Sequence, residues 1–102
     1  MDVLEKELEA RLTRAVRARG GLCLKWVSPG ASGVPDRMVL LPGGQVVFVE
    51  LKRPRGGRVS ALQRYWAREL TRLGFACCLA RTEADVAQLV GAADHLTRRR
   101  DE

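Results

Sequence analysis

The segment that most constrains the fold of this chain is the run of residues 46–51, Val-Val-Phe-Val-Glu-Leu, in which only one side chain is polar. A strand that is apolar on both faces is typical of the centre of a covered sheet, because successive side chains point to opposite faces. A turn signal, Pro42-Gly43-Gly44, comes before this run and follows another run of apolar residues. We therefore predict a hairpin with strands over residues 36–41 and 45–52, of which the second is central.

The remaining elements alternate with turns rich in glycine and proline. Apolar residues at helical spacing predict helices over residues 4–19, 60–74 and 82–96, and short β-prone runs predict strands over 22–27 and 75–80. Three strands joined by short loops predict an antiparallel meander, and the helix before the last strand allows a parallel crossover.

The 102 residues leave room for one hydrophobic core. We expect a single α/β domain over residues 1–97 and a polar tail over 98–102. Its order is helix, three strands, helix, strand, helix, with a mixed four-stranded sheet flanked by helices.

The positive charge of the chain is concentrated in one segment. The formal net charge is +6, and residues 53–81 hold seven arginines and one acid, Glu69, so this segment alone carries +6. Such an excess favours an anionic partner, either nucleic acid or an acidic membrane surface. A solvated face that keeps the protein soluble is the alternative.

Other features exclude several classes of protein. Three cysteines, Cys23, Cys77 and Cys78, and one histidine are too few and too poorly spaced for a structural zinc site or a disulfide framework, so we interpret the cysteines as small buried side chains. No uncharged run reaches the ~18 apolar residues of a membrane span, and the charged residues after Met1 are unlike a signal peptide. We expect a cytoplasmic protein of a bacterial or phage-infected cell.

Two carboxylates and a lysine are expected to meet at one end of the sheet. Glu50 and Lys52 are two residues apart in a strand, so their side chains point to the same face. Equal numbers of residues before and after the turn place Asp36 at their level. Hard cations such as Mg²⁺ bind carboxylate oxygens, so the group suits metal-assisted phosphoryl transfer. The alternatives are an ordinary ion pair for Glu50 and Lys52 and a turn residue for Asp36.

The first helix places one glutamate inside its apolar stripe. At about 100° per residue, Glu5 falls inside the apolar stripe, between Leu12 and Val16, whereas Glu9 lies at the margin of the stripe and Glu7 faces solvent. A metal ion or a metal-bound water is a suitable partner for Glu5. A glutamate favoured by the dipole at the start of a helix is the alternative.

The second helix places a glutamine at the edge of its apolar stripe. Gln63 lies beside the stripe of Leu62, Trp66, Leu70 and Leu73, and it follows Ser60 at the spacing of a capping box. Gln63 therefore either caps the helix or reaches toward the same end of the sheet.

The run Gly33-Val34-Pro35-Asp36, followed by Glu50-Leu51-Lys52, resembles the signature of the PD-(D/E)XK nucleases. Glu5 in the first helix, the segment from Lys25-Trp26 to Pro29-Gly30, and Ser60 to Gln63 extend this likeness. Residues 3 to about 90 thus resemble the VRR-NUC (virus-type replication-repair nuclease) domain in its small stand-alone form.

This resemblance implies a restriction-endonuclease-like core and a metal-dependent DNA endonuclease. Asp36, Glu50 and the backbone carbonyl of Leu51 would bind Mg²⁺ or Mn²⁺, and Glu5, which the stripe favours over Glu9, would complete the metal shell directly or through water. Lys52 would orient or help to deprotonate the attacking water. Gln63 would position a ligand or a phosphate.

The same resemblance implies branched DNA, such as a four-way (Holliday) junction in replication, recombination or repair, as the substrate and a homodimer as the working form. The residues expected to contact DNA are Lys25, Ser28, Arg53, Arg55, Arg58, Arg64 and Arg68. Two alternatives stay open. One is a nicking or end-trimming nuclease without a preference for junctions, and the other is a basic nucleic-acid-binding module that does not cleave.

Overall fold

The structure, a computed structural model, describes the backbone of residues 3–101 and the side chains of residues 5–92. Its elements are α1 (Val3–Ala18), β1 (Leu22–Lys25), β2 (Arg37–Leu41), β3 (Gln45–Leu51), α2 (Ala61–Arg72), β4 (Ala76–Ala80) and α3 (Glu83–Asp101). This order confirms the order predicted from the sequence.

The four strands form one mixed sheet in the order β1-β2-β3-β4. β1 pairs antiparallel with β2, and β2 pairs antiparallel with β3. β4 returns through α2 and pairs parallel with β3. The predicted meander and the predicted crossover are both confirmed, and β3 lies inside the sheet as its apolar sequence requires.

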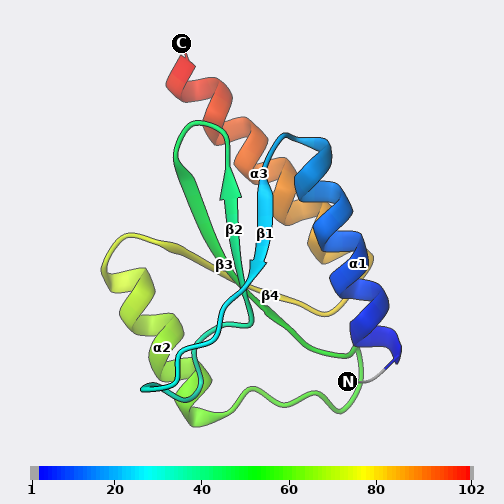
Figure 1. Ribbon diagram of the computed structural model, residues 1–102, viewed down its shortest axis with the longest axis vertical. Coiled ribbons are helices and arrows are strands. Elements are labelled where there is room, and N and C mark those ends of the chain that lie inside the picture. The colour runs from blue at the N-terminus through cyan, green and yellow to red at the C-terminus, as the bar shows by residue number, and fades with distance from the viewer. Residues whose placement is uncertain (1–2, 102) are drawn as a thin grey trace.

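The core lies between the sheet and two helices. Figure 1 shows α1 and α3 together on one side of the sheet and α2 on the other. The α1 residues Leu8, Leu12 and Val16 are buried, as the stripe predicts, whereas the side chain of Leu4 lies outside the described residues. The core also contains buried side chains of β2, β3 and α3, including Val39, Val47, Val49, Leu89 and Val90. α1 ends at Ala18 and is followed by Gly20, whose φ of 79° is a conformation that glycine adopts without strain.

The predicted apolar stripe of α2 is buried only in part. Leu70 is buried, but Leu62 is 51% exposed and Leu73 is 60% exposed, so the prediction of a buried stripe is wrong at these two positions. The physical reason is that α2 packs mainly on β4, the edge strand, and does not extend over the rest of the sheet.

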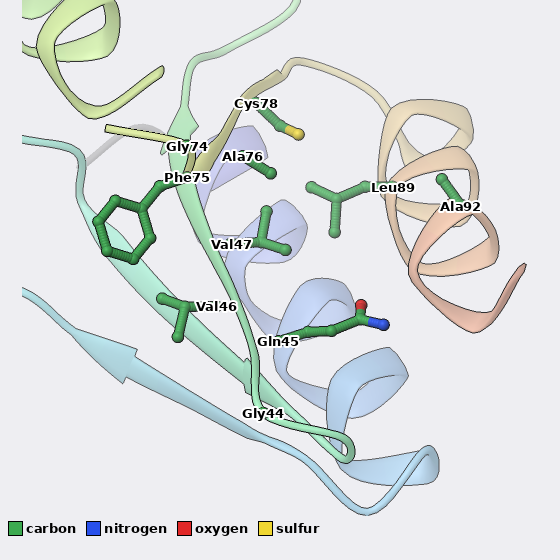
Figure 2. A pocket seen from close by; sticks show the side chains of 10 residues that line it. All are labelled: Gly44, Gln45, Val46, Val47, Gly74, Phe75, Ala76, Cys78, Leu89 and Ala92. Carbon is green, nitrogen blue, oxygen red and sulfur yellow. The ribbon is translucent and has the colours of Figure 1, made fainter. Parts of the chain in front are cut away.

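One face of the sheet is consequently uncovered over β1. Leu22, Leu24 and Phe75 are 40–49% exposed, and we call this surface the open sheet face. Figure 2 shows Phe75 and Val46 on the side of the sheet opposite to Val47 and Leu89.

Three further expectations need correction. The first strand ends at Lys25 rather than Val27, because its partner β2 begins at Arg37, which pairs with Lys25. The third helix continues to Asp101 instead of ending near Leu96. The sequence has no glycine or proline after Leu96, so polarity alone does not end this helix.

The three cysteines are free and half-buried rather than fully buried. No helix in the described part of the chain is long and apolar enough to cross a membrane.

Candidate active site

Residues from five elements, α1, β1, β2, β3 and α2, line one cavity at the end of the sheet where β1 and β3 end and β2 begins. Its volume is about 250 Å³, and it is lined by Glu5, Lys25, Asp36, Arg37, Glu50, Leu51, Lys52 and Gln63. Seven of these eight residues are candidates predicted from the sequence. The eighth, Arg37, was not predicted to belong to the site.

The hairpin places Asp36 beside Glu50. Arg37 pairs with Val49 across β2 and β3, so Asp36 lies level with Glu50. Its carboxylate Oδ2 accepts a hydrogen bond from the backbone N–H of Leu51 at 3.0 Å, and its carbonyl accepts one from the N–H of Trp26 at 2.9 Å. Asp36 is therefore fixed to two neighbouring strands while its side chain stays exposed to solvent.

Gly33 shapes the loop that leads to Asp36. Its φ is +89°, and a Cβ atom built on it would lie 2.6 Å from the Cβ of Leu62 in α2. Only glycine allows the loop to approach the start of α2 so closely. Trp66 of α2 holds the same loop, because its indole N–H donates to the carbonyl of Ser32 at 2.9 Å.

Glu50 is the most perturbed acid of the cavity. It is 9% exposed, and burial is the main cause that raises its pKa to about 8. The nearby charge of Asp36 and a hydrogen bond between the two carboxyl groups raise this pKa further. The Nζ of Lys52 lies 3.8 Å from Glu50 Oε1. Its positive charge lowers the pKa of Glu50, but by less than burial and Asp36 raise it. A cation placed between the two carboxylates would favour their ionised forms.

Gln63 joins the first turn of α2 to this cavity. Its Nε2 donates a hydrogen bond to Glu50 Oε1 at 2.9 Å. Its Oε1 accepts a hydrogen bond from the backbone N–H of Ser60 at 2.8 Å, and Ser60 Oγ accepts one from the N–H of Gln63. Both interpretations of Gln63 left open by the sequence therefore hold in the structure.

The three glutamates of α1 have different surroundings. Glu5 is half-buried and lines the cavity, whereas Glu7 is exposed. Glu9 forms an ion pair with Arg37 of β2. The sequence did contain a signal for Arg37, since it alternates with Val39 and Leu41, which point into the core.

The residues present fit a magnesium-type cation. Among the side chains of residues 5–92, no three carboxylate, thiol or imidazole groups gather closely enough to hold a metal ion by themselves. Mg²⁺, however, is usually held by one or two carboxylates, with water and substrate phosphates in its other positions. Asp36, Glu50 and the carbonyl of Leu51 match that donor set, and Glu5 lines the same cavity.

The residues expected to contact DNA lie around the cavity rather than inside it, with the exception of Lys25. Arg53, Arg55 and Arg58 are exposed in the loop that leaves β3. Arg64 and Arg68 are exposed on α2, and the guanidinium of Arg64 donates to the carbonyl of Val59 at 2.8 Å. Ser28 is half-buried in a turn, and its carbonyl accepts a hydrogen bond from the N–H of Ala31.

Comparison with known proteins agrees with this fold. No family model matches the chain. A solved structure described as a VRR_NUC domain superimposes with a TM-score of 0.82 and 26% identity, covering 88% of this chain and 97% of that one. A phage protein, "Putative nuclease p44" of Acyrthosiphon pisum secondary endosymbiont phage 1, is 50% identical over 52 residues, which are 51% of this chain and 56% of that protein. The match thus spans only about half the length of this curated relative. The element order and the near-complete structural match show that the chain has the fold of a VRR-NUC domain.

Proposed function

We propose that this chain is a nuclease that hydrolyses phosphodiester bonds of DNA with the help of Mg²⁺ or Mn²⁺. The observation that carries the proposal is the convergence of Asp36, Glu50 and Lys52 on one cavity of the VRR-NUC fold. The name of the phage relative also supports a nuclease.

Each residue of the cavity has a separate role in the proposed reaction. Asp36, Glu50 and the carbonyl of Leu51 would hold the cation, with Glu5 as a further ligand, directly or through water. When bound, the cation would supply charge stabilisation for the phosphodiester and lower the pKa of a water molecule. The charged Nζ of Lys52 would orient the attacking water and help its deprotonation by stabilising the hydroxide that forms. Gln63 fixes the orientation of the Glu50 carboxylate through its Nε2 hydrogen bond.

The basic surface supports nucleic acid as the substrate. Arg55 and Arg58 are exposed in the loop that leaves β3, and Arg68 is exposed on α2, the helix that carries Gln63. We propose branched DNA, including four-way junctions, as the preferred substrate, because the resemblance to stand-alone VRR-NUC domains implies it. A basic module that binds without cleavage is the second candidate, but it gains nothing from carboxylates held close to phosphates.

We further propose that the working form is a homodimer. The open sheet face supports this proposal, because contiguous exposed apolar side chains on a soluble protein mark interaction surfaces. Leu24→Lys should weaken self-association in sedimentation experiments and leave the fold intact. A wild-type chain that sediments as a monomer at micromolar concentration would contradict the dimer.

Cleavage of a panel of DNA substrates by the purified chain tests the function. Single-stranded, duplex, flap, splayed and four-way DNA would be incubated with Mg²⁺, Mn²⁺, Ca²⁺ or EDTA. We expect cleavage with Mg²⁺ or Mn²⁺, strongest on the branched substrates, and none with EDTA. Asp36→Ala and Lys52→Ala should abolish cleavage while DNA binding persists. Binding without cleavage by the wild-type chain in every metal would favour the non-cleaving module.

A further inference from the structure

We propose that the ion pair between Glu9 and Arg37 positions the site: it holds α1 so that Glu5 faces Asp36 and Glu50. The inference rests on the proposed function, because it concerns how the cavity obtains its third carboxylate. Neither Glu9 nor Arg37 needs to touch the metal or the DNA for this role.

The ion pair links two parts of the cavity that are distant in sequence, α1 and the start of β2. Glu5 and Glu9 are four residues apart on α1, so they lie one turn apart on the same face of the helix. Arg37 directly follows Asp36 and begins β2. The bond between Glu9 and Arg37 thus fixes the distance between the backbone that carries Glu5 and the backbone that carries Asp36.

The burial of Arg37 is costly, which argues against a role in stability alone. The Arg37 side chain is 10% exposed, that of Glu9 is 30% exposed, and the Nε of Arg37 is buried without a hydrogen-bond partner among the described residues. An unsatisfied buried N–H costs free energy, and a buried ion pair is often no more stabilising than apolar side chains of the same size. Fixing the register between two elements is the better attested role of such pairs.

The apolar contacts of α1 with the sheet do not fix its position in the same way. Leu8, Leu12 and Val16 attach the helix to the sheet through apolar contacts, which have no preferred direction. A hydrogen-bonded ion pair between a carboxylate and a guanidinium is directional. Groups that orient metal ligands typically change metal affinity or activity by about 10–100-fold when they are removed.

A variant that replaces the whole pair tests this proposal. Glu9→Leu/Arg37→Met removes one negative and one positive charge, so the net charge of the chain is unchanged, and its apolar side chains can fill the same space. Mn²⁺ binding to the DNA-free protein would be measured by titration calorimetry and thermal stability by melting. We expect Mn²⁺ affinity to fall about tenfold or more while the melting temperature changes little.

Two further variants distinguish positioning from other roles. Glu5→Gln should weaken Mn²⁺ binding in the wild-type chain but by less than about threefold in the pair variant, because the pair acts through Glu5. Arg37→Lys, which keeps the charge but not the planar guanidinium, should give an intermediate affinity and serves as the test if the pair variant fails to fold. Arg11→Gln/Glu83→Gln, which removes an exposed ion pair between α1 and α3, is the control and should leave Mn²⁺ binding unchanged.

The outcomes separate this inference from the proposed function. A pair variant that binds Mn²⁺ as tightly as the wild-type chain, while Glu5→Gln weakens binding, would overturn the inference and leave the nuclease proposal standing. Loss of Mn²⁺ binding in Glu9→Gln but not in Arg37→Met would also overturn it, because Glu9 would then bind the metal itself. A wild-type chain that binds no Mn²⁺ and cleaves no DNA would contradict the proposed function.

Discussion

Gln63 fixes Glu50 because a single side-chain amide serves both the cap of α2 and the cavity. With its Oε1 accepting from Ser60 N at 2.8 Å, the Nε2 is directed at Glu50 Oε1, which lies 2.9 Å away. Reversing the amide would break both hydrogen bonds. The capping box thus determines which atom of Gln63 faces the most buried carboxylate of the cavity.

This relationship predicts that capping and cleavage can be separated. Gln63→Glu keeps an acceptor for the Ser60 N–H but replaces the donor to Glu50 with a carboxylate oxygen. It should lower the cleavage rate at least tenfold. Ser60→Ala removes a capping acceptor and should lower the free energy of unfolding by about 1 kcal/mol with cleavage close to wild type. Urea unfolding and single-turnover cleavage measure the two effects. Equal loss of cleavage in both variants would show that the contact with Glu50 has no role.

The raised pKa of Glu50 predicts a pH-dependent stability of the metal-free protein. The folded state holds the proton up to pH about 8, whereas the carboxyl of the unfolded chain loses it near its ordinary pKa of 4.5. The stability from this proton is therefore fully present below pH 4.5 and is lost as the pH rises to about 8. Glu50→Gln should flatten this dependence. Urea unfolding in EDTA at pH 5 and pH 8.5 is the measurement, and identical pH dependence in both proteins would contradict the assignment.

Metal binding should reverse the loss of folding stability at high pH. A cation binds the ionised carboxylates, so Mg²⁺ or Mn²⁺ should raise the melting temperature more at pH 8.5 than at pH 5. Asp36→Ala should abolish this stabilisation at both pH values, whereas Glu7→Gln, at an exposed position of α1, should leave it unchanged. A metal effect that does not depend on Asp36 would place the cation elsewhere.

The sequence predicts those parts of the site that depend on local patterns. The apolar run of β3, the turn at Gly43-Gly44 and the alternation of side chains are enough to place Asp36 opposite Glu50. The sequence does not predict the exposure of Leu62, because helical periodicity shows which side chains share a face but not what covers that face. The contact between Glu9 and Arg37 is equally invisible, since it depends on how α1 lies on the sheet.

The position of the positive charge predicts how DNA binding depends on salt. The residues between Arg53 and Arg81 carry the whole net charge of +6. Replacing Arg55, Arg58, Arg64 and Arg68 by glutamine should therefore weaken DNA binding and flatten its salt dependence. Each lost phosphate contact lowers the slope of log K against log salt by about 0.9 on duplex DNA, and we expect about two to three such contacts.

The matched control for this variant removes the same charge from another face of the molecule. Arg11, Arg14, Arg17 and Arg19 belong to α1 and its end, are exposed, and can be replaced by glutamine in the same way. Because this variant has the same net charge, any difference in salt slope between the two reports contacts with phosphate rather than overall attraction. The cleavage rate at saturating DNA should stay close to that of the wild-type chain in both variants, since none of these arginines lines the cavity. If the salt slope falls in the variant at Arg11, Arg14, Arg17 and Arg19 but is unchanged in the variant at Arg55, Arg58, Arg64 and Arg68, the DNA lies across α1.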